Sequence, residues 1–521
     1  MKMSKKLGIA LAALLMTFSM TTQVAAQKPD EGAKKPDEKP PSEGAAPKEE
    51  SSITDHSIKI GGATIAYQAT AGTLLLKDEK GEVTASLYYT AYTKSDVKDA
   101  SQRPLSFVYN GGPGSSSVWL HMGAFGPRRV VTVDADATPP PPYKLADNAS
   151  CLLDKTDLVF IDPIGTGFSK PEGKAKGKDF WGVDQDVKSL AQFITSYVSR
   201  NSRWNSPKYL LGESYGTFRS AALVNYLQSR NGMDFNGVVL ISNILDLATI
   251  TFPNGDDRPF ILYLPSYAAT AWYHKLLKDR PADLDAFLME VRRFAANEYA
   301  VALMKGSKIS PAEKAGMAKK LSGLTGLSEE YLSKADLRVN LPQFLAELQR
   351  GRELATGRLD ARFSGPSFDL LTEFVFHDPQ SNAVTGAFTA AFNSYVRDEL
   401  KFGKDKSYVI LSYEANRAWD WKHDDGPGGG FPNSPNVEAD LAQAMVNNTH
   451  LQIEVENGIY DMATPFYESE YTMDHLGLPA KLQNHIQFKY YEAGHMMYVQ
   501  EASLQKLKSN VAAFIDRTSH P

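Results

Sequence analysis

Cysteine is nearly absent from this chain, which has a single one, Cys151, among 521 residues. One cysteine excludes an intramolecular disulfide framework, and it excludes a metal site made of cysteines alone. An isolated cysteine is most often a small buried hydrophobic side chain, and we expect that role for Cys151.

A strong charge of either sign is also missing. The chain has 56 Lys and Arg against 61 Asp and Glu, a formal net charge of −5, so its composition gives no reason to expect a nucleic-acid partner. Its 42% of hydrophobic and 22% of charged residues are typical of a globular protein. The length allows one large domain with an insertion, or two to three domains.

Long hydrophobic runs are scarce, and the one near the start is too short to span a membrane. It covers residues 7–20, follows three lysines and precedes small residues at 24–26. This order predicts a signal peptide over residues 1–26, with an uncleaved anchor as the alternative. We therefore expect an exported protein, bacterial and either periplasmic or extracellular, with no membrane span once the signal is cleaved.

Apolar residues are scarce again over residues 27–54, which are rich in Lys, Pro and Glu and are predicted to form a disordered linker. Residues 55–245 then alternate between apolar runs with strand character, such as 105–109 and 237–242, and helical stretches such as 184–198. Strands that alternate with helices indicate a mainly parallel sheet with helices on both faces.

A short motif, GESYG at residues 212–216, lies between an apolar strand and a helical stretch. A lone match to Gly-x-Ser-x-Gly is weak evidence for a catalytic serine, but the order of strand, sharp turn and helix is that of a nucleophile elbow. The glycines make room for the tight turn, and the turn exposes Ser214 at the carboxyl end of a strand.

A glycine-rich loop, NGGPGSSS at residues 110–117, directly follows the strand over 105–109. It lacks the Lys-Ser/Thr that a phosphate-binding P-loop needs. In acyl transfer by a serine, backbone N–H groups must stabilise an oxyanion, and glycines let the backbone approach it. One such N–H is expected from this loop and the other from Tyr215, the residue after the nucleophile.

Two further candidates lie in loops after late strands. Asp461 follows a strand over 451–455, and His495 follows a strand over 486–491. The chain order Ser214, Asp461, His495 is the order expected of an α/β-hydrolase, in which the acid orients the histidine. The long gap before Asp461 accommodates an inserted domain.

Histidine is otherwise scattered. No His-Glu-x-x-His motif occurs, so we expect neither a metal nor a cofactor. His121 lies close after the glycine-rich loop, and we interpret it as a residue of the pocket wall.

Residues 246–445 have helical patterns and a Gly-rich stretch at 424–430, and we interpret them as a mostly helical cap. Residues 446–521 are expected to complete the core.

Together these motifs resemble the serine carboxypeptidase family. The resemblance rests on the glycine-rich loop, the elbow, residues 164–169 (IGTGFS) and residues 494–496 (GHM), and covers about residues 85–245 and 445–516. It is nearest to secreted bacterial members, and it implies an exopeptidase that removes C-terminal residues from peptides or proteins. Ser214 would be the nucleophile, His495 the general base and Asp461 the group that orients it.

The resemblance also implies the residues that bind the substrate. The N–H groups of Gly112 and Tyr215 would bind the oxyanion. Asn110, Gly111 and Glu213 would recognise the terminal carboxylate, and Met496 would line the pocket of the leaving residue. Two carboxylates can share a hydrogen bond only if one of them is protonated, so Glu213 needs a raised pKa and binding should favour acidic pH.

Three positions depart from the family pattern. Ser115 replaces a cysteine, Val108 replaces a tryptophan, and Ala124 stands where members often have a second Glu that shares a proton with the first. The same triad would serve an esterase, lipase or acyltransferase, and a non-catalytic binding protein on a hydrolase scaffold is the remaining alternative. Asn110 and Glu213 favour the peptidase.

Overall fold

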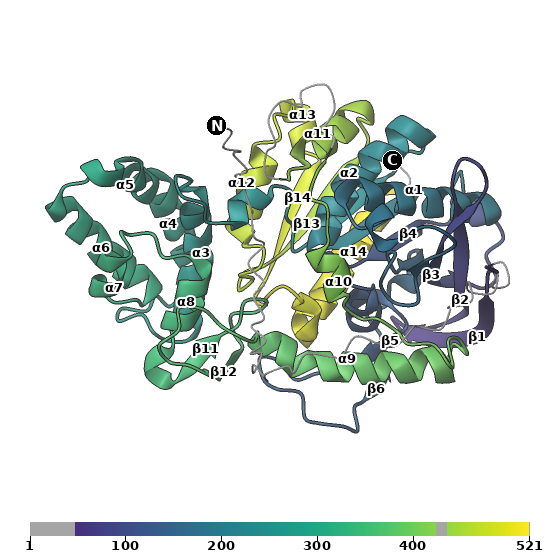
Figure 1. Ribbon diagram of the computed structural model, residues 1–521, viewed down its shortest axis with the longest axis horizontal. Coiled ribbons are helices and arrows are strands. Elements are labelled where there is room, and N and C mark those ends of the chain that lie inside the picture. The colour runs from purple at the N-terminus through teal and green to yellow at the C-terminus, as the bar shows by residue number, and fades with distance from the viewer. Residues whose placement is uncertain (1–46, 424–434, 520–521) are drawn as a thin grey trace, which may run out of the picture. The chain divides into compact units, whose positions relative to one another are not determined.

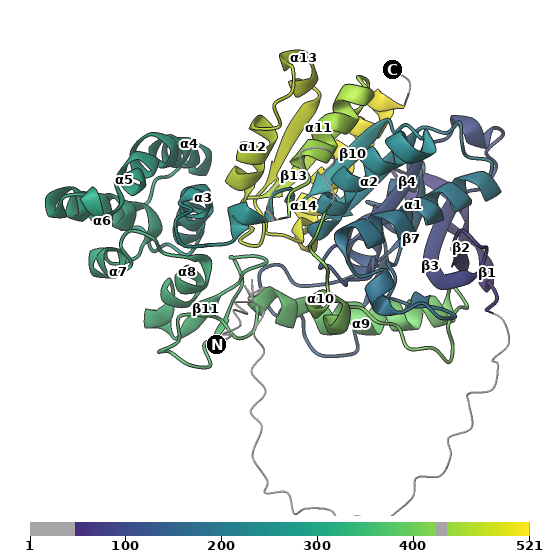
Figure 2. The same ribbon diagram turned by 45° about the horizontal axis from the view of Figure 1, so that its top comes forward.

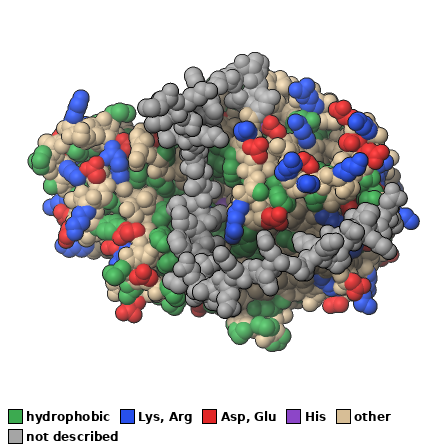
Figure 3. Space-filling model, in the orientation of Figure 1, with side chains coloured by type: hydrophobic (Ala, Val, Ile, Leu, Met, Phe, Trp, Pro, Cys, Tyr) green, Lys and Arg blue, Asp and Glu red, His purple; other side chains and the backbone are tan. Residues whose placement is uncertain are grey.

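The computed structural model describes residues 47–423 and 435–519. The predicted signal peptide, most of the predicted linker and the Gly-rich stretch at 424–430 therefore lie outside the described residues. No helix within the two described ranges is both long and apolar enough to cross a membrane. On the face drawn in Figure 3, basic and acidic side chains are interspersed.

A 10-stranded sheet is the centre of the fold (Figure 1), and its strand order is β1-β2-β3-β7-β4-β9-β10-β13-β14, with β8 beside β3. The strands from β7 to β14 run parallel, whereas β1, β2 and β3 pair antiparallel at one edge. The strand bounds are β1 Ser51–Ile60, β2 Ala63–Lys77, β3 Val83–Lys94, β4 Leu105–Tyr109, β7 Asp157–Ile161, β8 Lys170–Pro171, β9 Lys208–Glu213, β10 Gly237–Ile241, β13 Gln452–Gly458 and β14 Ile486–Tyr491.

The antiparallel edge follows from short turns. Gly61 and Gly62 both have positive φ angles, 57° and 84°, and they join β1 to β2. β1 begins at Ser51, inside the segment 27–54, and pairs with Gly72 of β2 at that end. Only one face of this edge strand is covered, so exposed and half-buried side chains alternate along β1. Its first residues therefore resemble a polar linker in sequence, although they form a strand.

Helices cover both faces of the sheet (Figures 1 and 2), which confirms the predicted α/β-hydrolase class of fold. Consecutive strand residues divide between the faces: Leu210 packs with the cluster of α1, α2 and α11, and Leu211 with that of α9 and α14. The bounds are α1 Val183–Arg200, α2 Tyr215–Asn231, α9 Pro379–Asp398, α11 Glu438–Asn447 and α14 Glu501–Thr518.

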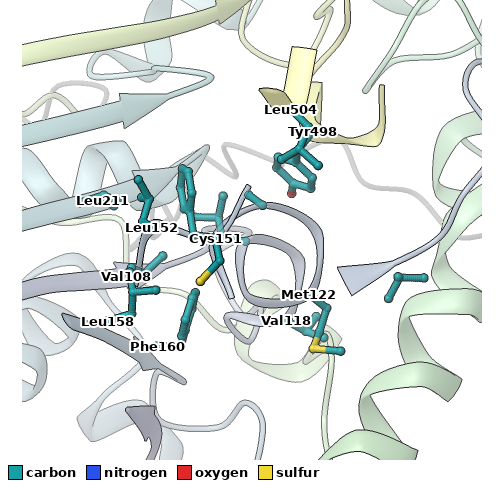
Figure 4. Close-up of a cluster of buried hydrophobic side chains, with 14 of the residues drawn as sticks. Val108, Val118, Met122, Cys151, Leu152, Leu158, Phe160, Leu211, Tyr498 and Leu504 are labelled. Carbon is teal, nitrogen blue, oxygen red and sulfur yellow. The ribbon is translucent and has the colours of Figure 1, made fainter. Parts of the chain in front are cut away.

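Cys151 lies in the second of these clusters (Figure 4), where it is free and buried between Val108, Leu152 and Phe160. Burial raises the pKa of its thiol to about 12. The predicted role as a small buried side chain is confirmed.

The region between β10 and β13 has two parts. Its first part packs around a hydrophobic cluster of its own, which α12 also joins. Its second part returns to the sheet, since α9 and α11 belong to the clusters on the two sheet faces. The remaining bounds are α3 Arg258–Tyr273, α4 Leu284–Phe294, α5 Ala300–Met304, α6 Pro311–Thr325, α7 Glu329–Lys334, α8 Leu341–Glu347, α10 Tyr413–Arg417, α12 Phe466–Asp474, α13 Ala480–Gln483, β5 Arg128–Val130, β6 Leu145–Asp147, β11 Leu354–Thr356 and β12 Ser364–Pro366.

Candidate active site

Ser214 lies at a strained turn between β9 and α2. Its φ and ψ are 60° and −130°, a conformation that is rare for a residue with a side chain. A Cβ on Gly212 would collide with the carbonyl of Gly216, so the turn requires a glycine there. The Ser214 N–H donates to the carbonyl of Ile241 at 2.9 Å. These features are those of a nucleophile elbow.

His495 and Asp461 form a buried pair. The Nδ1 atom of His495 lies 2.7 Å from Oδ2 of Asp461. The same carboxylate accepts hydrogen bonds from the N–H groups of Ala463 and Thr464 and from the Thr464 hydroxyl. An ionised carboxylate can only accept, so Nδ1 carries a proton and Nε2 is left to act as a base. Burial is the largest single influence and disfavours the imidazolium, but the charge and hydrogen bond of Asp461 and the charge of Glu213 together raise the pKa of His495.

The loops that carry these residues converge on the end of β10. Ile241 accepts the N–H of Ser214, and the next residue, Ser242, donates its hydroxyl to the carbonyl of His495 at 2.8 Å. A Cβ on Gly458 would lie 2.7 Å from the Ala493 carbonyl oxygen, so the loops after β13 and β14 touch. The Ser214 hydroxyl makes no hydrogen bond within the described part of the chain, as is common in unliganded sites.

The glycine-rich loop lies against the elbow. A Cβ on Gly111 would lie 2.7 Å from the backbone nitrogen of Gly216 and 2.8 Å from the carbonyl oxygen of Glu213. The next residue, Gly112, has a φ of 107°, which a residue with a side chain rarely adopts. Tyr215 is the first residue of α2, so its N–H has no acceptor within the helix. The two predicted oxyanion donors therefore belong to adjoining segments.

Asn110 and Glu213 meet beside the elbow. Asn110 Nδ2 donates to Glu213 Oε1 at 2.9 Å, and its Oδ1 accepts the N–H of Leu120, which fixes the orientation of the amide. Glu213 is only 4% exposed. Burial is the main influence on its carboxyl and raises the pKa of Glu213 to about 7, so the neutral form is well populated near neutrality. Met496, also predicted for the site, is buried next to His495.

One predicted pocket residue does not belong to the site. His121 is buried in the core, where its ring stacks on Phe160 at 4.2 Å and its Nε2 lies 2.6 Å from the Tyr92 hydroxyl. Burial lowers the pKa of His121 to about 3. The interpretation as a wall residue was wrong, because nearness in sequence to the glycine-rich loop says nothing about which way the following turn faces.

A segment that sequence reasoning missed joins the two catalytic loops. Asp360 accepts the N–H of Gly494 at 3.0 Å, and the carbonyl of Leu359 accepts the N–H of His495 at 2.6 Å. Arg358 accepts the N–H of Met462 at its carbonyl. Two of these contacts join backbone groups and one uses the Asp360 carboxylate, all across more than one hundred positions, and no local sequence pattern marks them. In residues 47–423 and 435–519 we find no group of acidic, His or Cys side chains arranged to hold a metal.

Comparisons with known proteins agree with this geometry. A family model described as serine carboxypeptidase matches residues 65–300. The pheromone-processing carboxypeptidase KEX1 of Saccharomyces cerevisiae is 32% identical over 160 residues, which are 29% of this chain and 21% of the relative. Serine carboxypeptidase-like 50 of Arabidopsis thaliana is 27% identical over 272 residues, 51% of this chain and 54% of the relative. The chain thus matches between about a fifth and about half of the length of these relatives.

A solved structure is similar over most of the chain. The crystal structure of Kex1(delta)p, a prohormone-processing carboxypeptidase from Saccharomyces cerevisiae, matches with a TM-score of 0.54 at 17% identity, and covers 87% of this chain and 92% of the other. At this identity the match supports the fold. Fold and site define an α/β-hydrolase with serine, aspartate and histidine in that order. The sequence matches show that the chain is similar to serine carboxypeptidases, through a family model over residues 65–300 and through curated relatives over part of their length.

Proposed function

We propose that this protein is a serine carboxypeptidase, which releases C-terminal residues from peptides through an acyl-enzyme on Ser214. The observation that supports it most is the Asn110–Glu213 pair beside the elbow, with its 2.9 Å hydrogen bond. A serine, a histidine and a buried acid serve many hydrolases, whereas a neutral carboxyl next to an amide is suited to a substrate that ends in a carboxylate.

The reaction begins at Ser214. Its hydroxyl attacks the last peptide bond, and His495 Nε2 takes the proton. Asp461 holds the imidazole through Nδ1 and stabilises the imidazolium that forms. The N–H groups of Gly112 and Tyr215 donate to the developing oxyanion, a task suited to backbone groups that need no rearrangement.

The second half of the reaction uses the same groups. His495 gives its proton to the leaving amino group, so the terminal residue departs with a free amine. A water molecule, deprotonated by His495, then attacks the acyl-enzyme and regenerates Ser214. Met496, buried beside His495, is proposed as part of the pocket for the departing residue.

The terminal carboxylate of the substrate would be held by Asn110, the N–H of Gly111 and the carboxyl of Glu213. Two carboxylates repel unless one carries a proton, and Glu213 has a pKa of about 7. Below that pH the neutral Glu213 donates to the substrate carboxylate. The same arrangement gives an amide or an ester no comparable advantage.

Export and domain roles belong to the same proposal. A signal peptide over residues 1–26 and a linker after it would deliver the enzyme to the periplasm or exterior of a bacterium, where it meets peptide C-termini. The helical part of the segment 246–445 is proposed as a cap that shapes the substrate pocket. No nucleic-acid partner enters this proposal.

The test compares a blocked dipeptide that has a free carboxylate with its C-terminal amide. A serine carboxypeptidase prefers the free carboxylate by a large factor, and Ser214→Ala abolishes both the cleavage and the labelling by a fluorophosphonate. Equal cleavage of the two substrates would favour an esterase or acyltransferase. If the wild type does not react with the fluorophosphonate, the protein is a non-catalytic binder.

A further inference from the structure

The second oxygen of Glu213 has no partner inside the described part of the chain. Asn110 occupies Oε1, while Oε2 is buried and forms no hydrogen bond there. A buried carboxyl oxygen without a partner destabilises the folded protein, because it has lost its hydrogen bonds to water.

Tyr498 packs over Gly123. It lies three residues after His495, in the short 3-10 turn Met497–Val499, and is 2% exposed. Its ring covers Gly123 so closely that a Cβ there would lie 2.5 Å from the Cε2 atom of the ring. The glycine at 123 therefore makes room for the phenol. Figure 4 shows the ring with its hydroxyl at the end away from Leu504.

The hydroxyl of Tyr498 is a second unpartnered atom in the described part of the chain. Glu213 and Tyr498 act on each other: burial first and the Glu213 charge second raise the pKa of Tyr498, and its hydroxyl favours the charged form of Glu213. The Glu213 carboxyl and the Tyr498 hydroxyl are therefore two neighbouring buried groups, and each could be the hydrogen-bond partner that the other lacks. Their geometry lies slightly outside that of a formed hydrogen bond.

We propose that Tyr498 is a positioning residue for recognition of the substrate carboxylate: its hydroxyl takes the free oxygen of Glu213 and holds the carboxyl toward the substrate terminus. This inference rests on the proposed carboxypeptidase function. A hydroxyl can donate to an ionised carboxyl, and it can also donate to the oxygen of a neutral carboxyl whose own proton is directed at the substrate. The Tyr498 contact is thus compatible with both protonation states of Glu213. Glu213 then titrates as a single acid.

Burial is the main influence on Glu213 and raises its pKa, and four neighbouring groups modify this effect. His495, when charged, and the hydrogen bonds from Tyr498 and Asn110 lower the pKa of Glu213, whereas the charge of Asp461 raises it. Removing only the Tyr498 hydroxyl therefore raises the pKa of Glu213. Activity that needs neutral Glu213 then persists to higher pH.

The test is Tyr498→Phe, which keeps the ring over Gly123. With the free-carboxylate dipeptide at acidic pH, we expect KM to rise about tenfold, because Glu213 loses its second anchor. The alkaline limb of kcat/KM should move up by about one pH unit. Cleavage of the amide should change much less. In a Glu213→Gln background, the same substitution should add little.

Tyr92→Phe is the matched control, since Tyr92 is buried in the same cluster but its hydroxyl bonds to His121 and Tyr395. It should move neither KM nor the pH profile. If Tyr498→Phe leaves both unchanged, or affects amide and free carboxylate equally, the inference is overturned. If the wild type itself does not prefer the free carboxylate, the proposed function fails first, and the two failures are distinguishable.

Discussion

In the proposed function, Glu213 couples substrate recognition to pH. It is buried beside Ser214, its pKa is about 7, and its neutral form is the one that can donate to a substrate carboxylate. We expect kcat/KM for a free-carboxylate peptide to fall as pH rises through about 7. The matching ester has no carboxylate to recognise, so its profile should lack this limb.

Paired pH profiles of the two substrates measure this difference. Glu213→Gln, which stays neutral at all pH values, should remove the alkaline limb for the peptide. The acidic limb belongs to His495, whose pKa lies above its ordinary value, and should occur with both substrates because the base must be neutral in each reaction. An identical alkaline limb for ester and peptide would count against Glu213.

Asp461 determines which nitrogen of His495 carries the proton. In Asp461→Asn the amide would donate to Nδ1, and the remaining proton would move to Nε2, the atom that must accept from Ser214. We expect kcat to fall by about 10³–10⁴ with little change in KM. The rate of fluorophosphonate labelling should fall in parallel, and an unchanged rate would show that the 2.7 Å contact has no catalytic role.

For individual residues, the sequence predicted the candidates that glycine motifs and chain order can reveal. Ser214, Asp461 and His495 follow strands, and their chain order is informative without any structure. Tyr498 was missed because a tyrosine in an apolar segment is usually part of the core. Only its position over Gly123, reached through space from another strand's loop, distinguishes it.

The short segment from Arg358 to Phe363 supports the candidate site. It connects the Asp461 loop to the His495 loop through backbone hydrogen bonds and through the Asp360 carboxylate, which accepts the N–H of Gly494 and forms a buried ion pair with Arg362. Asp360→Asn would leave the Arg362 charge without its partner in the interior. We expect a loss of about 3–5 kcal/mol in the free energy of unfolding, and a lower kcat as His495 loosens.

Chemical denaturation of Asp360→Asn measures that loss. Lys334→Ala is the control, because its ion pair with Glu330 on α7 is exposed and should contribute nothing measurable. Equal stability of the Asp360 variant and the wild type would mean that the segment does not support the site.

Periodic patterns predicted the parallel strands and the helices that flank them, but they did not show which surface each helix meets. The helix α9 was expected in the cap because it lies within residues 246–445. Its apolar face, which includes Phe388 and Phe392, instead packs in the cluster on the sheet. Amphipathicity shows that one face is buried and does not show against what.

In the molecule as a whole, the lone thiol can report on unfolding. Cys151 lies in the core on one face of the sheet, and burial raises its pKa to about 12. A thiol reagent should therefore react with it only when that core opens. We expect negligible reaction in native buffer and stoichiometric reaction across the denaturant midpoint; rapid labelling of the native protein would contradict the packing around Cys151.

The hydrogen bonds at the end of β10 link the motions of the nucleophile and the base. Ile241, the last residue of β10, holds the Ser214 backbone, and Ser242, the next residue, holds that of His495, so the two anchors are one peptide unit apart at the end of a central strand. Bending or twisting of the sheet should therefore carry both groups in the same direction. We expect this to keep the separation between the Ser214 hydroxyl and the His495 imidazole, on which proton transfer depends steeply, nearly constant.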